Sequence, residues 1–174
     1  MQSVSLVAQV NYLRDFPEKG ILARMDVSGT IDKILRQKRG EIWSIHPDAT
    51  VYDAIKLMAE KNVGALLVME NDQLVGIISE RDYSRKVMLR GKTSRTSTVR
   101  EIMTTELTTA HPRETVEECL HFMTDKRIRH LPVVCDGELR GVISIGDLVK
   151  EVISTQSATL DALRDYISGG YPSA

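Results

Sequence analysis

The amino-acid sequence predicts an α/β (α+β) fold made of two βαββα-type repeats that pack with pseudo-two-fold symmetry. The first observation is an internal duplication: residues 46–82 align without a gap on residues 111–147, with 13 identities in 37 pairs. Unrelated segments of average composition would share about two or three. The second observation is that, in each copy, apolar runs of strand length alternate with apolar stripes of helical spacing. Each copy is too short to bury a core alone, so we expect the two to pack together.

Each copy is predicted to run as a short helix, a short strand, a capped helix, two paired strands and a final helix. In both copies a threonine precedes the central helix and an acidic residue follows three positions later, which is the capping-box spacing. The elements predicted for the first copy lie at residues 30–37, 41–45, a helix opening at Thr50, 65–69 and 74–79. Those predicted for the second lie at residues 98–103, 107–110, a helix opening at Thr115, 131–135 and 139–144. Asn71-Asp72 and Asp136-Gly137 predict tight turns between the paired strands.

The pattern divides the chain into four segments. We expect an N-terminal extension at residues 1–28, a first repeat at 29–95, a second repeat at 96–154 and a C-terminal tail at 155–174. A helix is predicted within the tail, at residues 158–167.

Composition excludes several classes of protein. Lys and Arg number 23 against 24 Asp and Glu, so the formal charge is −1, which argues against a dedicated nucleic-acid-binding protein. No apolar run approaches the ~20 residues that span a bilayer, and the N-terminal segment lacks the pattern of a secretory signal. Two cysteines do not form a disulfide framework. We therefore expect a cytoplasmic protein with neither a membrane nor a nucleic acid as partner.

Four short segments resemble a known family. They are residues 64–68 (GALLV) and 76–82 (GIISERD) in the first copy, and residues 127–134 (RIRHLPVV) and 141–147 (GVISIGD) in the second. The pattern resembles the CBS domain, present as a tandem pair or Bateman module, and is similar to a subfamily of small stand-alone CBS-pair proteins. The resemblance covers roughly residues 30–154, and it implies a homodimer that forms through the helices of the pair.

The resemblance also implies a ligand. CBS pairs bind adenine nucleotides and related adenosyl compounds between the repeats, at a Ser/Thr-x-x-Asp motif where the last strand enters its helix. Ser79 with Asp82, and Ser144 with Asp147, match those positions. A helix N-terminus offers N–H groups to a phosphate, and a carboxylate can accept both hydrogens of a ribose diol. The same spacing is also that of an ordinary helix cap, and both interpretations stay open at this point.

Basic residues distinguish the second copy from the first. Residues 126–132 (KRIRHLP) resemble a stretch of the nucleotide-sensing γ subunit of AMP-activated protein kinase, in which two adjacent basic side chains reach phosphates. Arg129 and His130 stand at those places, and the alternative for them is a solvated basic helix end. The first copy has Gly64-Ala65 there, so its phosphate partner must come from elsewhere.

A basic segment after the first motif supplies such partners. Arg81 is the first candidate, and Arg85, Lys86 and Arg95 follow it within 15 residues. The alternative is a solvated helix face. The difference between the copies predicts two unequal sites, one for a mononucleotide and the other for a longer ligand or for none.

Four other residues flank the expected pocket. His46 and His111 stand in His-Pro turns, and Thr50 and Thr115 cap the helices that follow, so all four are included as candidate nucleotide-binding residues. The histidines and cysteines show no metal-ligand spacing, and no metal site is expected. Trp43 is expected to make a core or dimer contact, with the base pocket as the alternative.

These expectations combine into one function and one alternative. The leading hypothesis is a regulatory module that binds AMP, ADP, ATP or NAD(H) and acts on an unknown regulated protein through changes in packing. The alternative is a structural dimerisation or interaction module without a physiological nucleotide. No nucleophile–base pair and no pair of catalytic acids is evident, so neither an enzyme nor a catalytic cofactor is expected.

Overall fold

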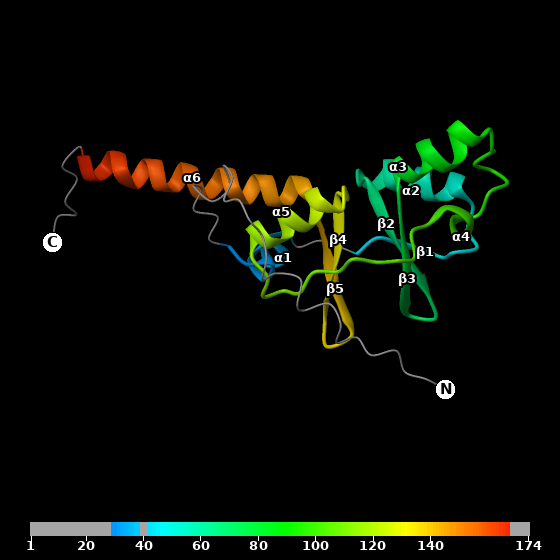
Figure 1. Cartoon of the computed structure of the whole chain (residues 1–174), viewed down its shortest axis with the longest axis horizontal. Helices are drawn as coiled ribbons and strands as arrows, with labels where there is room; N and C mark the ends of the chain where they lie inside the picture. The colour runs from blue at the N-terminus through cyan, green and yellow to red at the C-terminus, as the bar shows by residue number, and fades with distance from the viewer. Residues whose placement is uncertain (1–28, 39–41, 168–174) are drawn as a thin grey trace.

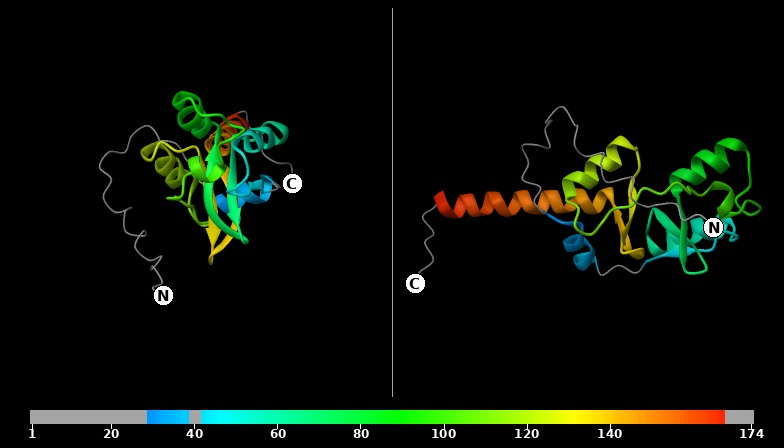
Figure 2. Two further views of the ribbon diagram at one scale, coloured as in Figure 1. Left: turned by 90° about the vertical axis from the view of Figure 1, so that its right-hand side faces the viewer. Right: turned by 60° about the horizontal axis from the view of Figure 1, so that its bottom comes forward.

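The computed structural model describes residues 29–38 and 42–167, with side chains up to residue 161. The described chain forms two lobes that lie side by side, each with a small sheet and flanking helices (Figures 1 and 2). The predicted α+β class with two repeated units is confirmed. The expected N-terminal extension, residues 1–28, and residues 168–174 of the expected tail 155–174 lie outside the described residues.

The order of elements repeats along the chain. The first copy contains α1 (Ile31–Lys38), β1 (Ser44–Ile45), α2 (Val51–Lys61), β2 (Ala65–Glu70), β3 (Gln73–Ser79), α3 (Glu80–Asp82) and the helical turns η2 (Tyr83–Val87) and η3 (Met88–Arg90). The second contains α4 (Val99–Ile102), α5 (Val116–Asp125), β4 (His130–Cys135), β5 (Glu138–Ser144) and α6 (Ile145–Ile167).

The paired strands follow the predicted hairpins. β2 is antiparallel to β3 and parallel to β1, and β4 is antiparallel to β5. Both turns have positive φ at their two central residues, Asn71-Asp72 and Asp136-Gly137, as a type I′ turn requires. The strand predicted at residues 107–110 is reduced to one parallel bridge, from Ala110 to Val133.

Each short N-terminal helix packs on the opposite copy. Ile31 of α1 is buried in the core of the second copy, and its N–H donates to the carbonyl of Glu114 at 3.0 Å. Val99 of α4 is buried in the core of the first copy, and its N–H donates to the carbonyl of Ala49 at 2.9 Å. Figure 1 shows α1 on the side of β5, and α4 beside the first sheet. Each hydrophobic core is therefore completed by a segment of the other repeat, because a four- or eight-residue helix cannot bury its apolar side chains alone.

Two equivalent glycines make room for these exchanged segments. A Cβ atom at Gly76 would lie 2.8 Å from Met103 Sδ and 3.1 Å from the carbonyl oxygen of Thr104. A Cβ atom at Gly141 would lie 2.7 Å from Leu35 Cδ2. The absence of a side chain at these positions lets the exchanged segments approach the sheets closely.

The helix predicted at residues 158–167 is the end of a longer one. α6 runs without interruption for 23 residues from Ile145 to Ile167. Its first turns pack on the second lobe through the buried side chains of Leu148 and Val152, whereas Leu160 is exposed. The end of α6 projects beyond the lobes (Figures 1 and 2).

Candidate functional site

Two cavities lie between the copies. The first, about 570 Å³, lies between Ser144 and Asp147 of the second copy and residues 62–65 of the first, and we call it the apolar cleft. The second, about 530 Å³, lies between residues 79–82 of the first copy and residues 127–130 of the second, and we call it the cationic cleft. Both volumes are in the range of small-molecule sites.

Asp147 is the carboxylate among the residues that line the apolar cleft. Its Oδ2 atom accepts hydrogen bonds from the Ser144 backbone N–H at 2.7 Å, from Ser144 Oγ at 2.8 Å and from Lys38 Nζ at 2.8 Å. Partial burial alone would raise the pKa of Asp147, but the hydrogen bonds from Lys38 and Ser144 outweigh it and hold the pKa below its usual value. The Asp147 side chain is therefore ionised and is held in place through Oδ2. Its other oxygen, Oδ1, has no hydrogen-bond partner among the described residues.

Half of the side chains that line the apolar cleft are hydrophobic. These six are Leu35, Ile42, Trp43, Val63, Ala65 and Val142. Trp43 also packs against the first core, and Lys61 Nζ lies 3.9 Å from the centroid of its ring. Both interpretations of Trp43 thus find support in the structure, because the ring reaches the core and the cleft.

The same type of cap lines the cationic cleft. The Ser79 N–H and Oγ donate to Asp82 Oδ2 at 3.0 and 2.6 Å, and Lys86 Nζ lies 2.8 Å from Asp82 Oδ1. Arg81 Nη1 donates to the carbonyl of Arg127 at 2.8 Å, which ties the two copies across the cleft. Both oxygens of Asp82 are therefore engaged, in contrast to those of Asp147.

Three arginines complete the cationic lining. Arg85, Arg127 and Arg129 line this cleft, and none of them forms an ion pair with a carboxylate of the described residues. Arg127 has φ of +52°, the left-handed conformation that ends α5, and Asn62 adopts the same φ at the end of α2. The backbone at the end of α5 thus places an arginine where the first copy has an asparagine.

His130 belongs to both clefts. Its ring lies against Gly64, where a Cβ atom would be only 3.4 Å from His130 Cε1. Burial and the positive charges of Lys38 and Arg129 lower the pKa of His130, although Asp147 opposes this shift. His130 is therefore predominantly neutral at pH 7 and forms part of the wall that separates the clefts.

The structure brings predicted residues of both copies together in each cleft. Ser79, Arg81 and Asp82 line the cationic cleft together with Arg129 and His130. The sequence suggested Arg81 and the basic segment as phosphate partners for the first motif, and the cleft contains Arg129 and His130 of the other copy in addition. The reason is that the two copies pack face to face. The residues that precede β4 in the second copy therefore lie opposite the Ser79–Asp82 cap of the first copy.

The second predicted motif lies in the other cleft. Ser144 and Asp147 line the apolar cleft and face Gly64 and Ala65, and Ser144 also reaches the cationic cleft. The motif of the second copy therefore lies opposite the residues before β2 of the first copy, where Gly64 and Ala65 replace Arg129 and His130.

The candidate partners from the basic segment separate into two groups. Arg85 and Lys86 line the cationic cleft. Arg95 instead lies over the ring of Tyr52, with its Cζ atom 4.3 Å from the ring centroid.

The four flanking residues lie at caps and turns and are not among the residues lining either cleft. Thr50 and Thr115 accept hydrogen bonds from the backbone N–H of the third helical residue, at 3.0 and 3.2 Å. The Nδ1 atoms of His46 and His111 accept backbone N–H groups two residues later, at 3.3 and 3.2 Å. Their contribution to nucleotide binding stays a prediction.

Sequence reasoning did not identify Lys38 or Arg127 as site residues. Lys38 is 109 positions from Asp147, and no spacing pattern connects them. Arg127 belongs to the basic stretch at residues 126–132 and aligns with Asn62 of the first copy. Because asparagine often ends a helix in the left-handed conformation, this alignment could have indicated that Arg127 ends α5 beside the cleft.

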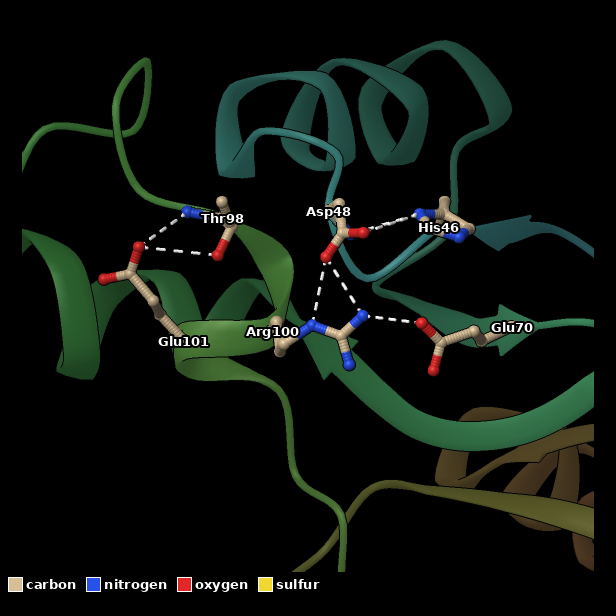
Figure 3. A network of polar contacts seen from close by, with 6 residues as sticks. All are labelled: His46, Asp48, Glu70, Thr98, Arg100 and Glu101. Atoms are coloured by element: carbon tan, nitrogen blue, oxygen red, sulfur yellow. Dashed lines mark hydrogen bonds and ion pairs between the residues drawn. The ribbon is translucent and has the colours of Figure 1, made fainter.

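His46, Asp48 and Glu70 form a small surface cluster. Their potential ligand atoms lie within 4.8 Å of one another, a grouping that the sequence spacing did not indicate. Arg100 of α4 donates to Asp48 at 3.0 Å and to Glu70 at 2.6 Å, as Figure 3 shows. The guanidinium group already supplies the positive charge at this cluster, which ties α4 to the first copy.

The comparisons with known proteins agree with this architecture. The sequence profile of the CBS domain matches residues 37–88 and 99–154, and the chain belongs to the CBS-domain family as a tandem pair. The CBS domain-containing protein CBSX3, mitochondrial, of Arabidopsis thaliana is 42% identical over an alignment of 163 residues that covers 86% of this chain and 79% of that protein.

Solved structures show the same fold. A CBS-domain protein from Burkholderia ambifaria is 47% identical, with a TM-score of 0.71 over 74% of this chain and 96% of that chain. The CBS domain pair of protein MJ0100, solved in complex with 5′-methylthioadenosine and S-adenosyl-L-methionine, is 27% identical. Its TM-score is 0.62 over 70% of this chain and 94% of that chain. None of the helices in the described ranges has the length and apolar character that a bilayer crossing requires.

Proposed function

We propose that this CBS pair is a regulatory module that binds adenine nucleotides (AMP, ADP, ATP or NAD(H)) in the clefts between its copies. The observation that carries the proposal is that residues of both copies line each cleft. Asp82 faces Arg129 and His130 of the other copy, and Asp147 faces Gly64 and Ala65. A ligand held by such a cleft contacts both copies at once.

Contact with both copies is what a sensor requires. A carboxylate such as Asp147, which is ionised and keeps Oδ1 available, can accept the two hydrogens of a ribose diol. A ligand that bridges the copies stabilises one relative orientation of the lobes over others. That difference in affinity is the coupling that a regulated partner would detect.

A binding role without catalysis is supported by the chemistry of the clefts. None of the lining residues forms a serine–histidine or cysteine–histidine hydrogen bond, and His130 is a neutral wall residue. The complex of MJ0100 with two adenosyl compounds supports the choice of ligand class. The cytoplasm stays the predicted compartment of this chain.

A homodimer is part of the proposal. Met88 and Ile153 occupy equivalent positions in the two copies, and both are about three-fifths exposed, at 62% and 60%. Two large apolar side chains at equivalent positions support an interface with a second copy through these helices.

The test is thermal unfolding of the full chain with AMP, ADP, ATP, NAD, NADH and S-adenosylmethionine. A ligand at 100 times its Kd stabilises the folded state by about 2.7 kcal/mol. Each kcal/mol raises Tm by about 2–4 °C for a chain of this size. We expect at least one ligand to raise Tm in this way and Asp147→Ala to reduce the shift.

A matched control separates the cleft from the cap. Glu118→Ala removes an equivalent capping carboxylate, which accepts from the Thr115 N–H at 2.8 Å but lines neither cleft. It should lower Tm without changing the ligand-induced shift. If no ligand changes Tm, the proposal is wrong and the structural dimerisation module is the better description.

A further inference from the structure

The cationic cleft collects positive charge that the fold itself does not neutralise. Five basic side chains line it: Arg81, Arg85, Lys86, Arg127 and Arg129. Two carboxylates, Glu80 and Asp82, also line it, and the only ion pair among these described groups joins Lys86 to Asp82. The formal charge of the lining is therefore strongly positive.

The basic groups come from both sides of the cavity. Arg81 and Arg85 follow the cap of the first copy, whereas Arg127 and Arg129 stand at the strand entry of the second. Arg81 is held in place because its Nη1 donates to the carbonyl of Arg127. Like charges that converge on a cavity repel one another, and an anion bound between them removes that repulsion.

The apolar cleft provides the internal comparison. Its described cations are Lys38 and Arg140, and each is paired with a carboxylate at 2.8 Å, Asp147 and Glu138 respectively. Both clefts have a Ser-x-x-Asp cap and similar volumes, so the unpaired guanidinium groups are the main chemical difference between them.

Guanidinium groups are suited to one class of ligand. Each presents a planar fork of N–H donors that matches two phosphate oxygens. Several such forks on opposite walls exceed what a single phosphate can satisfy. Beside them, Ile77, Ile128 and Ile145 supply apolar surface for a base.

We infer that the cationic cleft is a polyphosphate site that selects nucleoside di- and triphosphates over monophosphates and nucleosides. This inference rests on the proposed function, since it names the ligand class of one of the two proposed clefts. The Arg127 and Arg129 side chains contact the phosphate chain together with Arg85. The cap of Ser79 and Asp82 faces the nucleoside.

The experiment is isothermal titration of the full chain with adenosine, AMP, ADP, ATP and inorganic tripolyphosphate, without magnesium and at two salt concentrations. We expect affinity at one site to increase from AMP to ATP and to fall as salt screens the charges. Arg129→Ala should weaken ATP binding about tenfold or more and leave adenosine binding unchanged. Lys126→Ala is the matched control, because Lys126 is an adjacent exposed cation that does not line the cleft.

The outcomes distinguish this inference from the proposed function. If adenosine and ATP bind with equal affinity, or if Lys126→Ala weakens ATP as much as Arg129→Ala, the polyphosphate site is wrong while nucleotide sensing stands. If tripolyphosphate binds as tightly as ATP, the cleft recognises phosphate alone and its assignment to nucleotides is wrong. If no adenosine compound binds at all, the proposed function itself fails.

Discussion

The apolar and cationic clefts occupy equivalent places in a duplicated fold, yet they differ in charge. Where the cationic cleft has Arg127, Arg129 and His130, the apolar cleft has the equivalent residues Asn62, Gly64 and Ala65. The backbone is nevertheless the same: residues 62 and 127 both have φ of +52°, and both hairpins carry an irregularity at equivalent positions. The two copies thus share one backbone conformation, and the different side chains give the two clefts different charges.

The ion pairs show the same divergence. Lys86 in the first copy lies beside Asp82, whereas the equivalent residue of the second copy is Glu151, which is buried and paired with Lys33 at 2.6 Å. Lys33 and Lys38 of α1 therefore supply in the second lobe the positive charge that Lys86 supplies in the first. The exchange of α1 thus brings two ion pairs to the second lobe as well as apolar packing.

The largest expected effect tests whether the two exchanged segments are held equally tightly. Gly76→Ala should destabilise the protein by about 2–3 kcal/mol, because its Cβ meets the Thr104 carbonyl as well as Met103. Gly141→Ala should cost about 1 kcal/mol or less, because only the flexible end of Leu35 must move. Urea denaturation of both variants measures the difference.

A second variant indicates whether crowding is the cause. Leu35→Val should restore stability in the Gly141→Ala background, whereas shortening Met103 should not restore Gly76→Ala, since the Thr104 backbone is held by hydrogen bonds of 2.9 and 3.0 Å to Ile77. Equal losses for the two glycine variants would contradict the difference between the lobes.

The next effect concerns the residue that ends the central helix. Arg127→Asn should raise stability by up to about 1 kcal/mol, because asparagine tolerates left-handed φ better than arginine. The same change should weaken ATP binding at the cationic cleft. Asn62→Arg should do the reverse in the apolar cleft, with lower stability and stronger ATP binding. Thermal unfolding measures the stability of both variants, and calorimetry measures their affinity for ATP. If ATP affinity changes while stability does not, the left-handed conformation at these positions does not limit stability.

The smallest effect concerns the wall between the clefts. The pKa of His130 in the folded protein is below the usual 6.5. As pH falls through 6.5 the unfolded chain takes up a proton at this residue before the folded one does, so stability decreases. We expect His130→Gln to remove this loss of stability from the pH dependence of unfolding.

Ligand binding should alter the same titration. A polyphosphate in the cationic cleft offsets the charge of Arg129 and raises the pKa of His130, so wild-type stability should depend less on pH between 5 and 7 when ATP is bound. His121→Gln, which changes a partly exposed histidine on α5, is the control and should leave the His130 contribution in place. If wild type and His130→Gln show the same pH dependence, this account of His130 is wrong.

The amino-acid sequence by itself determined the repeated unit. The offset of 65 residues, the threonine caps and the turn residues Asn71-Asp72 and Asp136-Gly137 predicted the central helices and both hairpins. These features are local, because caps and turns satisfy backbone groups within a few residues. The Ser-x-x-Asp motifs were found for the same reason.

The tertiary structure alone decided which residues share a cleft. Sequence comparison places Arg129 in the copy that contains Ser144, and packing of the copies brings Ser79 and Asp82 of the other copy into the same cleft. It also brings Lys38 to Asp147 across 109 positions. Such contacts depend on how two apolar faces dock and exchange α1 and α4, and neither periodicity nor local propensity within one copy specifies that arrangement.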